Sequence, residues 1–221
     1  MDRTRRTLLT LPLAVIVSRA GRGAAQSQQP NLNQLPPNLP IPIDDGAARH
    51  LIGMALPDVA LPSTKNRLVN LSKIAVPRTV VYAYPRTGRP SEPIPAGWDE
   101  IPGARGCTPE TCGFRDHHED LARLGAEVFG LGTQDTAYQQ EMVKRLDVPF
   151  EVLSDEALRF TRALRLPTFI FQGATLLKRL TLVARQGRIE HVFYPVFPPD
   201  THAAEVIAWL KDHPASRLAG K

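Results

Sequence analysis

The sequence predicts an α/β domain in which helices cover the faces of a central sheet. Short β-branched and apolar runs alternate along the chain with segments of helical periodicity, which is the pattern of such a domain. The chain has 221 residues and is 43% apolar, enough for one well-buried domain with length left over for tails or linkers. We therefore expect a single catalytic domain.

The predicted strands are short and are bounded by turn-forming residues. Residues 79–84 form a buried-strand candidate that Pro85 ends, and residues 127–131 form a second. Residues 180–184 and 189–193 flank Gln186-Gly187 and predict a β-hairpin. Helices are expected at 109–124, 135–146, 156–164 and 202–212.

Residues 1–25 have the charged, apolar, small-residue order of an export signal. Arg5-Arg6 precede the apolar run, as in signals of the twin-arginine type. The run has about ten residues, too few to span a bilayer, so no stable membrane insertion is expected. The mature protein would be periplasmic or otherwise extracytoplasmic, or cytoplasmic if this segment is not a signal.

Residues 26–48 are rich in Pro, Gln and Asn and predict an extended, solvated linker. The folded domain is assigned to residues 49–214. The 27 basic and 22 acidic residues give a net charge of +5, but the basic residues are scattered. A nucleic-acid partner is not expected, because no sustained basic block is present.

The chain has two cysteines, Cys107 and Cys112, five positions apart. A structural disulfide framework normally uses more cysteines and closes longer loops, so the pair indicates local redox chemistry. Pro109 suits the first turn of a helix, and Glu110 suits the positive end of its dipole. Cys107 is therefore expected at a helix start, where the pKa of a thiol falls below its ordinary value of about 8.5.

On one helix, a separation of five residues places two Cα atoms roughly 8–9 Å apart and about 140° around the axis. A disulfide needs less than about 7 Å. Residues 107–113 must therefore unwind before Cys107 and Cys112 can join, and Gly113, a poor helix former, would make this easier.

Residues 86–105 contain repeated Pro and Gly and predict an unusually long surface loop that leads to Cys107. Loops of this length tend to be functional or disordered. Two interpretations remain open: Trp98 packs over the site as part of a lid, or the segment is an incidental insertion.

Residues 106–116, Gly-Cys-Thr-Pro-Glu-Thr-Cys-Gly-Phe-Arg-Asp, closely resemble the active-site helix of the bacterioferritin-comigratory, or Q-type, peroxiredoxins. The similarity covers roughly residues 53–211. Residues 53–58, 69–72, 150–155 and 178–183 also match the pattern of this family. The resemblance implies a thioredoxin-like fold with a central mixed β-sheet flanked by helices.

The resemblance also implies a thiol-dependent peroxidase that reduces hydrogen peroxide or organic hydroperoxides. Cys107 would be the peroxidatic cysteine, Cys112 the resolving cysteine, and Arg179 the residue that stabilises thiolate and peroxide. A thioredoxin-like dithiol protein would reduce the disulfide, with no metal or organic cofactor. The protein would be a monomer or a weak homodimer.

The chain departs from the family pattern at Ala104, where a threonine hydroxyl is expected to contact peroxide and thiolate. Thr87 or Thr108 is a candidate replacement. The departure supports a competing function, that of a thiol-disulfide oxidoreductase or redox sensor on the same fold with little peroxidase activity. A metal site using Cys107, Cys112 and His117-His118 is a second competing interpretation, and a non-enzymatic interaction domain is a third.

Overall fold

A computed structural model describes residues 31–215, which fold around a five-stranded mixed sheet of order β5-β4-β3-β8-β9. The parallel strands are β3 (Arg78–Ala83), β4 (Ala126–Gly132) and β5 (Glu151–Ser154). The remaining two, β8 (Leu180–Arg185) and β9 (Arg188–Phe193), run antiparallel to their neighbours. This topology confirms the predicted fold class.

Two small hairpins lie outside the main sheet. One joins β1 (Ala60–Pro62) to β2 (Leu68–Asn70), and the other joins β6 (Thr168–Phe171) to β7 (Ala174–Leu177). The helices are α1 (Cys107–Asp116), α2 (His118–Arg123), α3 (Thr136–Arg145), α4 (Arg159–Leu164) and α5 (His202–Asp212). None of the helices within residues 31–215 combines the length and apolar character needed to cross a bilayer.

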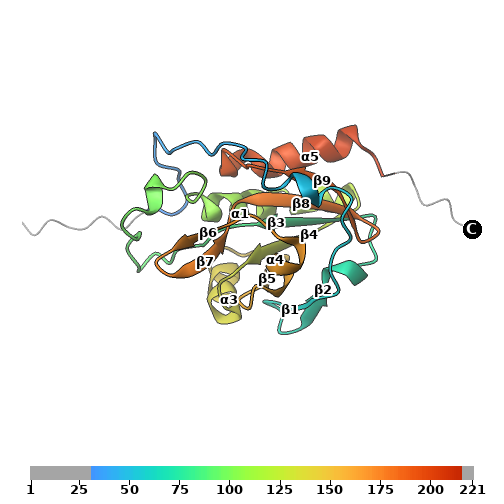
Figure 1. Cartoon of the computed structure of the whole chain (residues 1–221), viewed down its shortest axis with the longest axis horizontal. Helices are drawn as coiled ribbons and strands as arrows, with labels where there is room; N and C mark the ends of the chain where they lie inside the picture. The colour runs from blue at the N-terminus through green and yellow to red at the C-terminus, as the bar shows by residue number, and fades with distance from the viewer. Residues whose placement is uncertain (1–30, 216–221) are drawn as a thin grey trace, which may run out of the picture.

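Alternate residues of β3 face two separate apolar clusters, because successive side chains of a strand point to opposite faces. Val80 and Tyr82 join a cluster with Phe114 of α1 and Val206 of α5. On the opposite face, Val81 joins a cluster supplied by α4 and the β1–β2 hairpin. Figure 1 shows α5 along one side of the sheet and the β6–β7 hairpin beside the green 86–105 segment at one end.

The predicted strands 79–84, 127–131, 180–184 and 189–193 are confirmed to within one residue. The predicted helix 109–124 is wrong in one respect, since the chain leaves helical geometry at His117, where ψ is 11°. Phe114 and Leu121 are seven residues apart and both face the same cluster, so the apolar pattern continues through the bend and hides it.

The predicted helix 156–164 begins only at Arg159. Leu158 has a φ of 56°, and the Asp155 carboxylate accepts hydrogen bonds from the backbone N–H groups of Phe160 and Thr161 at 3.1 and 2.7 Å. The carboxylate thus satisfies donors of the first turn that have no partner within the helix.

Residues 31–48 form neither helix nor strand, but they are not only a solvated spacer. Leu32 lies against Gly88, and Leu35 lies against Gly106. Farther along, Asp45 accepts hydrogen bonds from Lys178 Nζ at 2.7 Å and Tyr194 Oη at 2.8 Å. This segment is therefore fastened to the domain near Cys107. The predicted export signal, residues 1–25, lies outside the described residues.

Candidate active site

Cys107 is the first residue of α1 and is buried, with 3% of its surface exposed. Gly106 precedes it with a φ of 103°, a conformation that favours glycine. A Cβ at this position would overlap Pro199 Cγ and would lie 2.8 Å from Leu35 Cδ2. Glycine is thus required here for two reasons, the backbone angle and the close approach of two neighbouring segments.

Arg179 lies just before β8 and points its guanidinium at the Cys107 thiol. Its Nη2 is 3.1 Å from Cys107 Sγ. The same side chain donates to the backbone carbonyls of Gly103, Ala104 and Arg105 at 3.1 to 3.3 Å. Only 1% of the Arg179 side chain is exposed, so its charge acts in a site from which water is largely excluded.

Glu110 is the second acidic partner of Arg179. It lies one turn after Cys107, is fully buried, and forms an ion pair with Arg179 Nη1. Its other oxygen, Oε1, has no hydrogen-bond partner among the described residues. Burial raises the pKa of the Glu110 carboxyl, and Arg179 only partly offsets this. One guanidinium therefore faces two acidic groups, whose titrations are coupled.

The predicted lowering of the Cys107 pKa is wrong in its net direction. Burial raises the pKa of the Cys107 thiol, and the Glu110 carboxylate raises it further. Arg179 and the backbone N–H of Arg86 lower it but do not outweigh burial. The sequence shows that Cys107 starts a helix, whereas its burial arises from segments that are distant along the chain.

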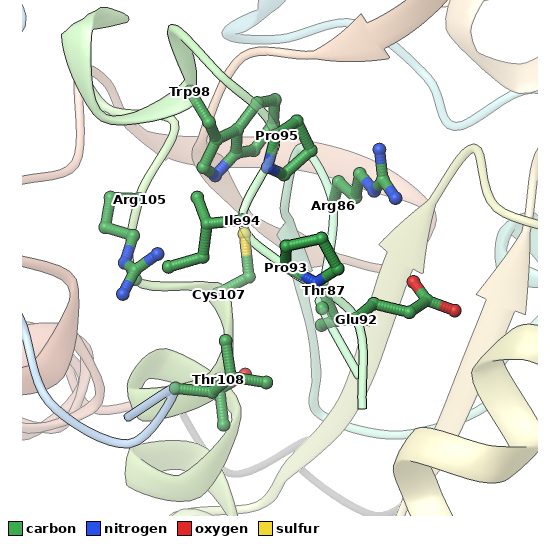
Figure 2. A pocket seen from close by; sticks show the side chains of 13 residues that line it. Arg86, Thr87, Glu92, Pro93, Ile94, Pro95, Trp98, Arg105, Cys107 and Thr108 are labelled. Carbon is green, nitrogen blue, oxygen red and sulfur yellow. The ribbon is translucent and has the colours of Figure 1, made fainter. Parts of the chain in front are cut away.

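A small pocket of about 40 Å³ opens onto Cys107. The Pro93–Pro95 stretch, Trp98 and Leu32 of the N-terminal segment supply its apolar lining. Its charged lining residues are Arg86, Glu92 and Arg105. Figure 2 shows the Cys107 sulfur directed towards Ile94 and the proline-rich stretch, with the Arg105 side chain beside it. The predicted surface loop 86–105 is thus partly buried, and Trp98 and Ala104 belong to an apolar cluster.

Thr87 and Thr108 both line this pocket and are both buried. The Thr87 hydroxyl and its backbone N–H both donate to Gln134 Oε1, at 3.2 and 2.9 Å. Within residues 31–215, neither threonine hydroxyl forms a hydrogen bond to Cys107. Ala104 contributes its carbonyl instead, which lies 3.6 Å from Cys107 Sγ.

Cys112 lies on the same helix as Cys107, is half-buried, and carries a free thiol, as Cys107 does. Burial raises the pKa of Cys112, and Arg115 lowers it. The helix between the cysteines is intact, and the Thr111 hydroxyl donates to the Cys107 carbonyl at 2.9 Å. Phe114 stacks on Tyr82 with ring centroids 4.4 Å apart, which anchors the segment that must unwind before a disulfide forms.

The residues of the competing metal site do not converge. His117 pairs with Asp120 at 3.4 Å, and the His118 ring lies 5.8 Å from that of Phe150. No group of three His, Cys, Asp or Glu side chains suited to a metal ion occurs within residues 31–215.

Sequence reasoning missed Glu110 as a member of the site. A carboxylate in the first turn of a helix is common on protein surfaces, and no local signal shows that this one is buried beside Arg179. It also missed Leu32 and Ile94, because apolar residues between prolines have no periodicity that would place them against a distant cysteine.

A mixed sheet with a buried thiol at a helix start, an arginine beside it and a second thiol on the same helix defines a thiol-based redox protein of thioredoxin-like fold. The model of the Redoxin family matches residues 51–207. The chain belongs to this family, and within it to the peroxiredoxins of the Q type.

The relatives support this assignment along most of the chain. A chloroplastic peroxiredoxin Q of Sedum lineare is 30% identical over 176 residues, which cover 79% of this chain and 86% of the relative. The chloroplastic peroxiredoxin Q of Oryza sativa subsp. japonica is 33% identical over 160 residues. That match covers 72% of this chain and 66% of the rice protein, slightly less than two thirds of its length.

A solved structure shows the same fold. The peroxidoxin BcpB of Mycobacterium tuberculosis superposes with a TM-score of 0.58 at 22% identity. The superposition covers 73% of this chain and 96% of that one. The resemblance to Q-type peroxiredoxins and the thioredoxin-like fold are therefore both confirmed.

Proposed function

We propose that this protein is a thiol-dependent peroxidase in which Cys107 is the peroxidatic cysteine. The observation that carries the proposal is the contact of 3.1 Å between Arg179 Nη2 and the buried Cys107 Sγ, beside a pocket that opens onto the sulfur. An arginine remains charged at all relevant pH values and presents several donors in one plane. Arg179 is thus suited to stabilise the thiolate and to donate to a peroxide oxygen.

In the first step, the Cys107 thiolate attacks the nearer peroxide oxygen. The S–O bond forms as the O–O bond breaks, and the leaving oxygen takes a proton to become water or an alcohol. Cys107 is then a sulfenic acid, the first stage of thiol oxidation. Thr87 and Thr108 line the pocket, and their hydroxyl oxygens are the candidates for the contact that Ala104 cannot provide.

In the second step, Cys112 attacks the Cys107 sulfur. The S–S bond forms, and the hydroxyl of the sulfenic acid leaves as water. Because α1 holds the two cysteines on one intact helix, its first turns must open before this step. An external thioredoxin-like dithiol protein then exchanges with the disulfide, returning both thiols while its own pair is oxidised.

The burial of Cys107 argues against the competing function of a thiol-disulfide exchanger. A protein disulfide would have to reach a sulfur at the base of a pocket of about 40 Å³ in a residue that is 3% exposed. A small peroxide needs no more space than this pocket provides beside the sulfur.

The compartment and domain limits belong to the same proposal. The order of residues 1–25 supports an export signal, followed by a linker to residue 48 and the catalytic domain at 49–214. The protein would then act outside the cytoplasm as a monomer or weak homodimer, with an extracytoplasmic dithiol protein as reductant. Fractionation of cells that express the full chain tests the location.

Single-turnover reaction with hydrogen peroxide tests the chemistry. Cys112→Ser should stop after one turnover, with a sulfenic acid at Cys107 that dimedone traps and mass spectrometry detects. Cys107→Ser should consume no peroxide. The mechanism is wrong if Cys107→Ser consumes peroxide as fast as the unmodified protein.

A further inference from the structure

The pocket at Cys107 is small beside the sulfur. At roughly 10–15 Å³ for each water, a space of about 40 Å³ holds about three water molecules. Hydrogen peroxide has two heavy atoms and fits this space. The tert-butyl and cumyl hydroperoxides carry branched or aromatic groups on one oxygen, and these groups would overlap the wall when the other oxygen meets Cys107 Sγ.

The part of the wall that would meet such a group comes from the 86–105 segment. Ile94, Pro95 and Trp98 are apolar and line the pocket, and Figure 2 shows them on the side to which the Cys107 sulfur points, with Ile94 next to the sulfur. These side chains bound the space mainly by their shape, because the Trp98 indole N–H is the one polar side-chain group among the three.

Trp98 is held in place by side chains from a separate hairpin. Its ring meets that of Phe171 at an angle of 67° with centroids 5.0 Å apart, and lies 6.2 Å from that of Phe169. Ala104 and Leu176 complete this cluster. An aromatic ring packed among other rings cannot move aside without loss of these contacts.

Both ends of the 86–105 segment are fastened to the domain. At its start, the Arg89 guanidinium lies 4.1 Å from the centre of the Tyr138 ring, and Arg145 Nη2 donates to the Gly88 carbonyl at 3.1 Å. At its end, Arg179 donates to the backbone carbonyls of Ala104 and Arg105. Within the segment, Arg105 pairs with Asp99 at 3.4 Å. The wall is thus built as a fixed part of the site.

A larger cavity nearby does not border the sulfur. It has a volume of about 300 Å³ and is lined by residues that include Ile41, Phe169 and Arg179. Cys107 is not among its lining residues. The cavity therefore reaches Arg179, which contacts the thiol at 3.1 Å, but it does not border the sulfur itself.

We propose that the 86–105 segment determines peroxide specificity, admitting hydrogen peroxide to Cys107 and excluding peroxides with bulky organic groups. The inference rests on the proposed peroxidase function and names Ile94 and Trp98 as the specificity-determining residues. Leu32 closes another side of the same pocket.

The test compares hydrogen peroxide with cumene hydroperoxide in a Cys112→Ser background, where the reaction stops at the sulfenic acid. The second-order rate constant for each peroxide is measured by dimedone trapping. In the protein with an unaltered pocket wall, hydrogen peroxide should react at least about tenfold faster than cumene hydroperoxide. Ile94→Ala and Trp98→Ala should each raise the rate ratio of cumene hydroperoxide to hydrogen peroxide by about tenfold or more, since small changes in pocket size have effects of this order.

Ile170→Ala is the matched control, because Ile170 is 76% exposed on β6 and is not a lining residue of the pocket. It should leave the ratio unchanged. If Trp98→Ala does not fold, Ile94→Ala decides. The specificity proposal fails if cumene hydroperoxide reacts as fast as hydrogen peroxide before the wall is changed, or if Ile94→Ala leaves the ratio unaltered. If hydrogen peroxide reacts no faster than with free cysteine, the proposed function itself is wrong.

Discussion

Replacement of Glu110 by Gln is expected to lower the pKa of Cys107. Glu110 and Cys107 share the Arg179 guanidinium, through Nη1 and Nη2 respectively. The Glu110 carboxylate raises the pKa of the thiol, because two negative charges in one buried site repel each other. Glutamine keeps the shape and an oxygen for Arg179 but removes this charge.

The size of the effect follows from Coulomb's law. Two acceptors on neighbouring guanidinium nitrogens are on the order of 6 Å apart, and at an effective dielectric constant of about 20 their repulsion is roughly 3 kcal/mol. This energy corresponds to about two pKa units. Burial raises the pKa of Glu110 and lowers its ionised fraction, so this value is an upper limit.

The assay is the pH dependence of iodoacetamide alkylation of Cys107 in the Cys112→Ser background. The rate rises with pH as the thiolate forms, and Glu110→Gln should move this rise to lower pH. Glu119→Gln is the matched control, because the Glu119 side chain is 85% exposed on α2, and it should leave the profile in place. An unchanged or higher pKa in Glu110→Gln would refute the reasoning.

The pKa of Cys107 also links stability to pH. The folded protein binds the thiol proton more tightly than the unfolded chain does, because burial raises the pKa. The free energy of unfolding should therefore fall as pH rises through the interval between the ordinary thiol pKa and the raised value. Glu110→Gln should make this fall smaller.

Two further substitutions test the same geometry. Arg179→Lys keeps the charge but loses the planar set of donors that reaches Cys107, Glu110 and the carbonyls of residues 103–105. The rate of sulfenic acid formation should therefore fall by at least about tenfold. A rate within a factor of two of the unmodified protein would contradict this role. Gly106→Ala should lower the free energy of unfolding, measured in urea, by more than the roughly 1–3 kcal/mol of a strained backbone angle, since its Cβ would also meet Pro199 and Leu35. Gly173→Ala is the control, because Gly173 also has a positive φ, 80°, but has open space around the added Cβ. Equal losses of unfolding free energy in the two variants would show that the contacts at Gly106 do not matter.

The long strands were predictable from sequence because apolar runs of five or six residues next to turn-forming residues have few other interpretations. The residues of β3, β4 and β8 have this form, and β9 was predictable as the partner of β8 across the turn at Gln186-Gly187. In contrast, β1, β2, β6 and β7 have three or four residues each, too few for a period to appear. Those strands form because tertiary contacts hold their partners in place.

At the site, sequence reasoning located the residues that belong to the helix and identified Arg179 only through family resemblance. Cys107 and Cys112 follow from one local pattern, whereas Thr87 and Thr108 became candidates only as replacements for the family threonine missing at Ala104. The electrostatics of Cys107 could not be predicted in the same way, because burial depends on Leu35, Pro199 and the 86–105 segment. A helix start favours a thiolate, and a dry environment opposes it; only the three-dimensional packing shows which effect is larger.

The position of both cysteines on one continuous helix means that redox state and backbone structure change together. An intact α1 and a bond between Cys107 and Cys112 cannot exist in the same molecule, because the Cα separation of five helical residues exceeds the span of a disulfide. Amide hydrogen exchange in residues 107–113 should therefore report the fraction of oxidised protein without any reagent that reacts with sulfur.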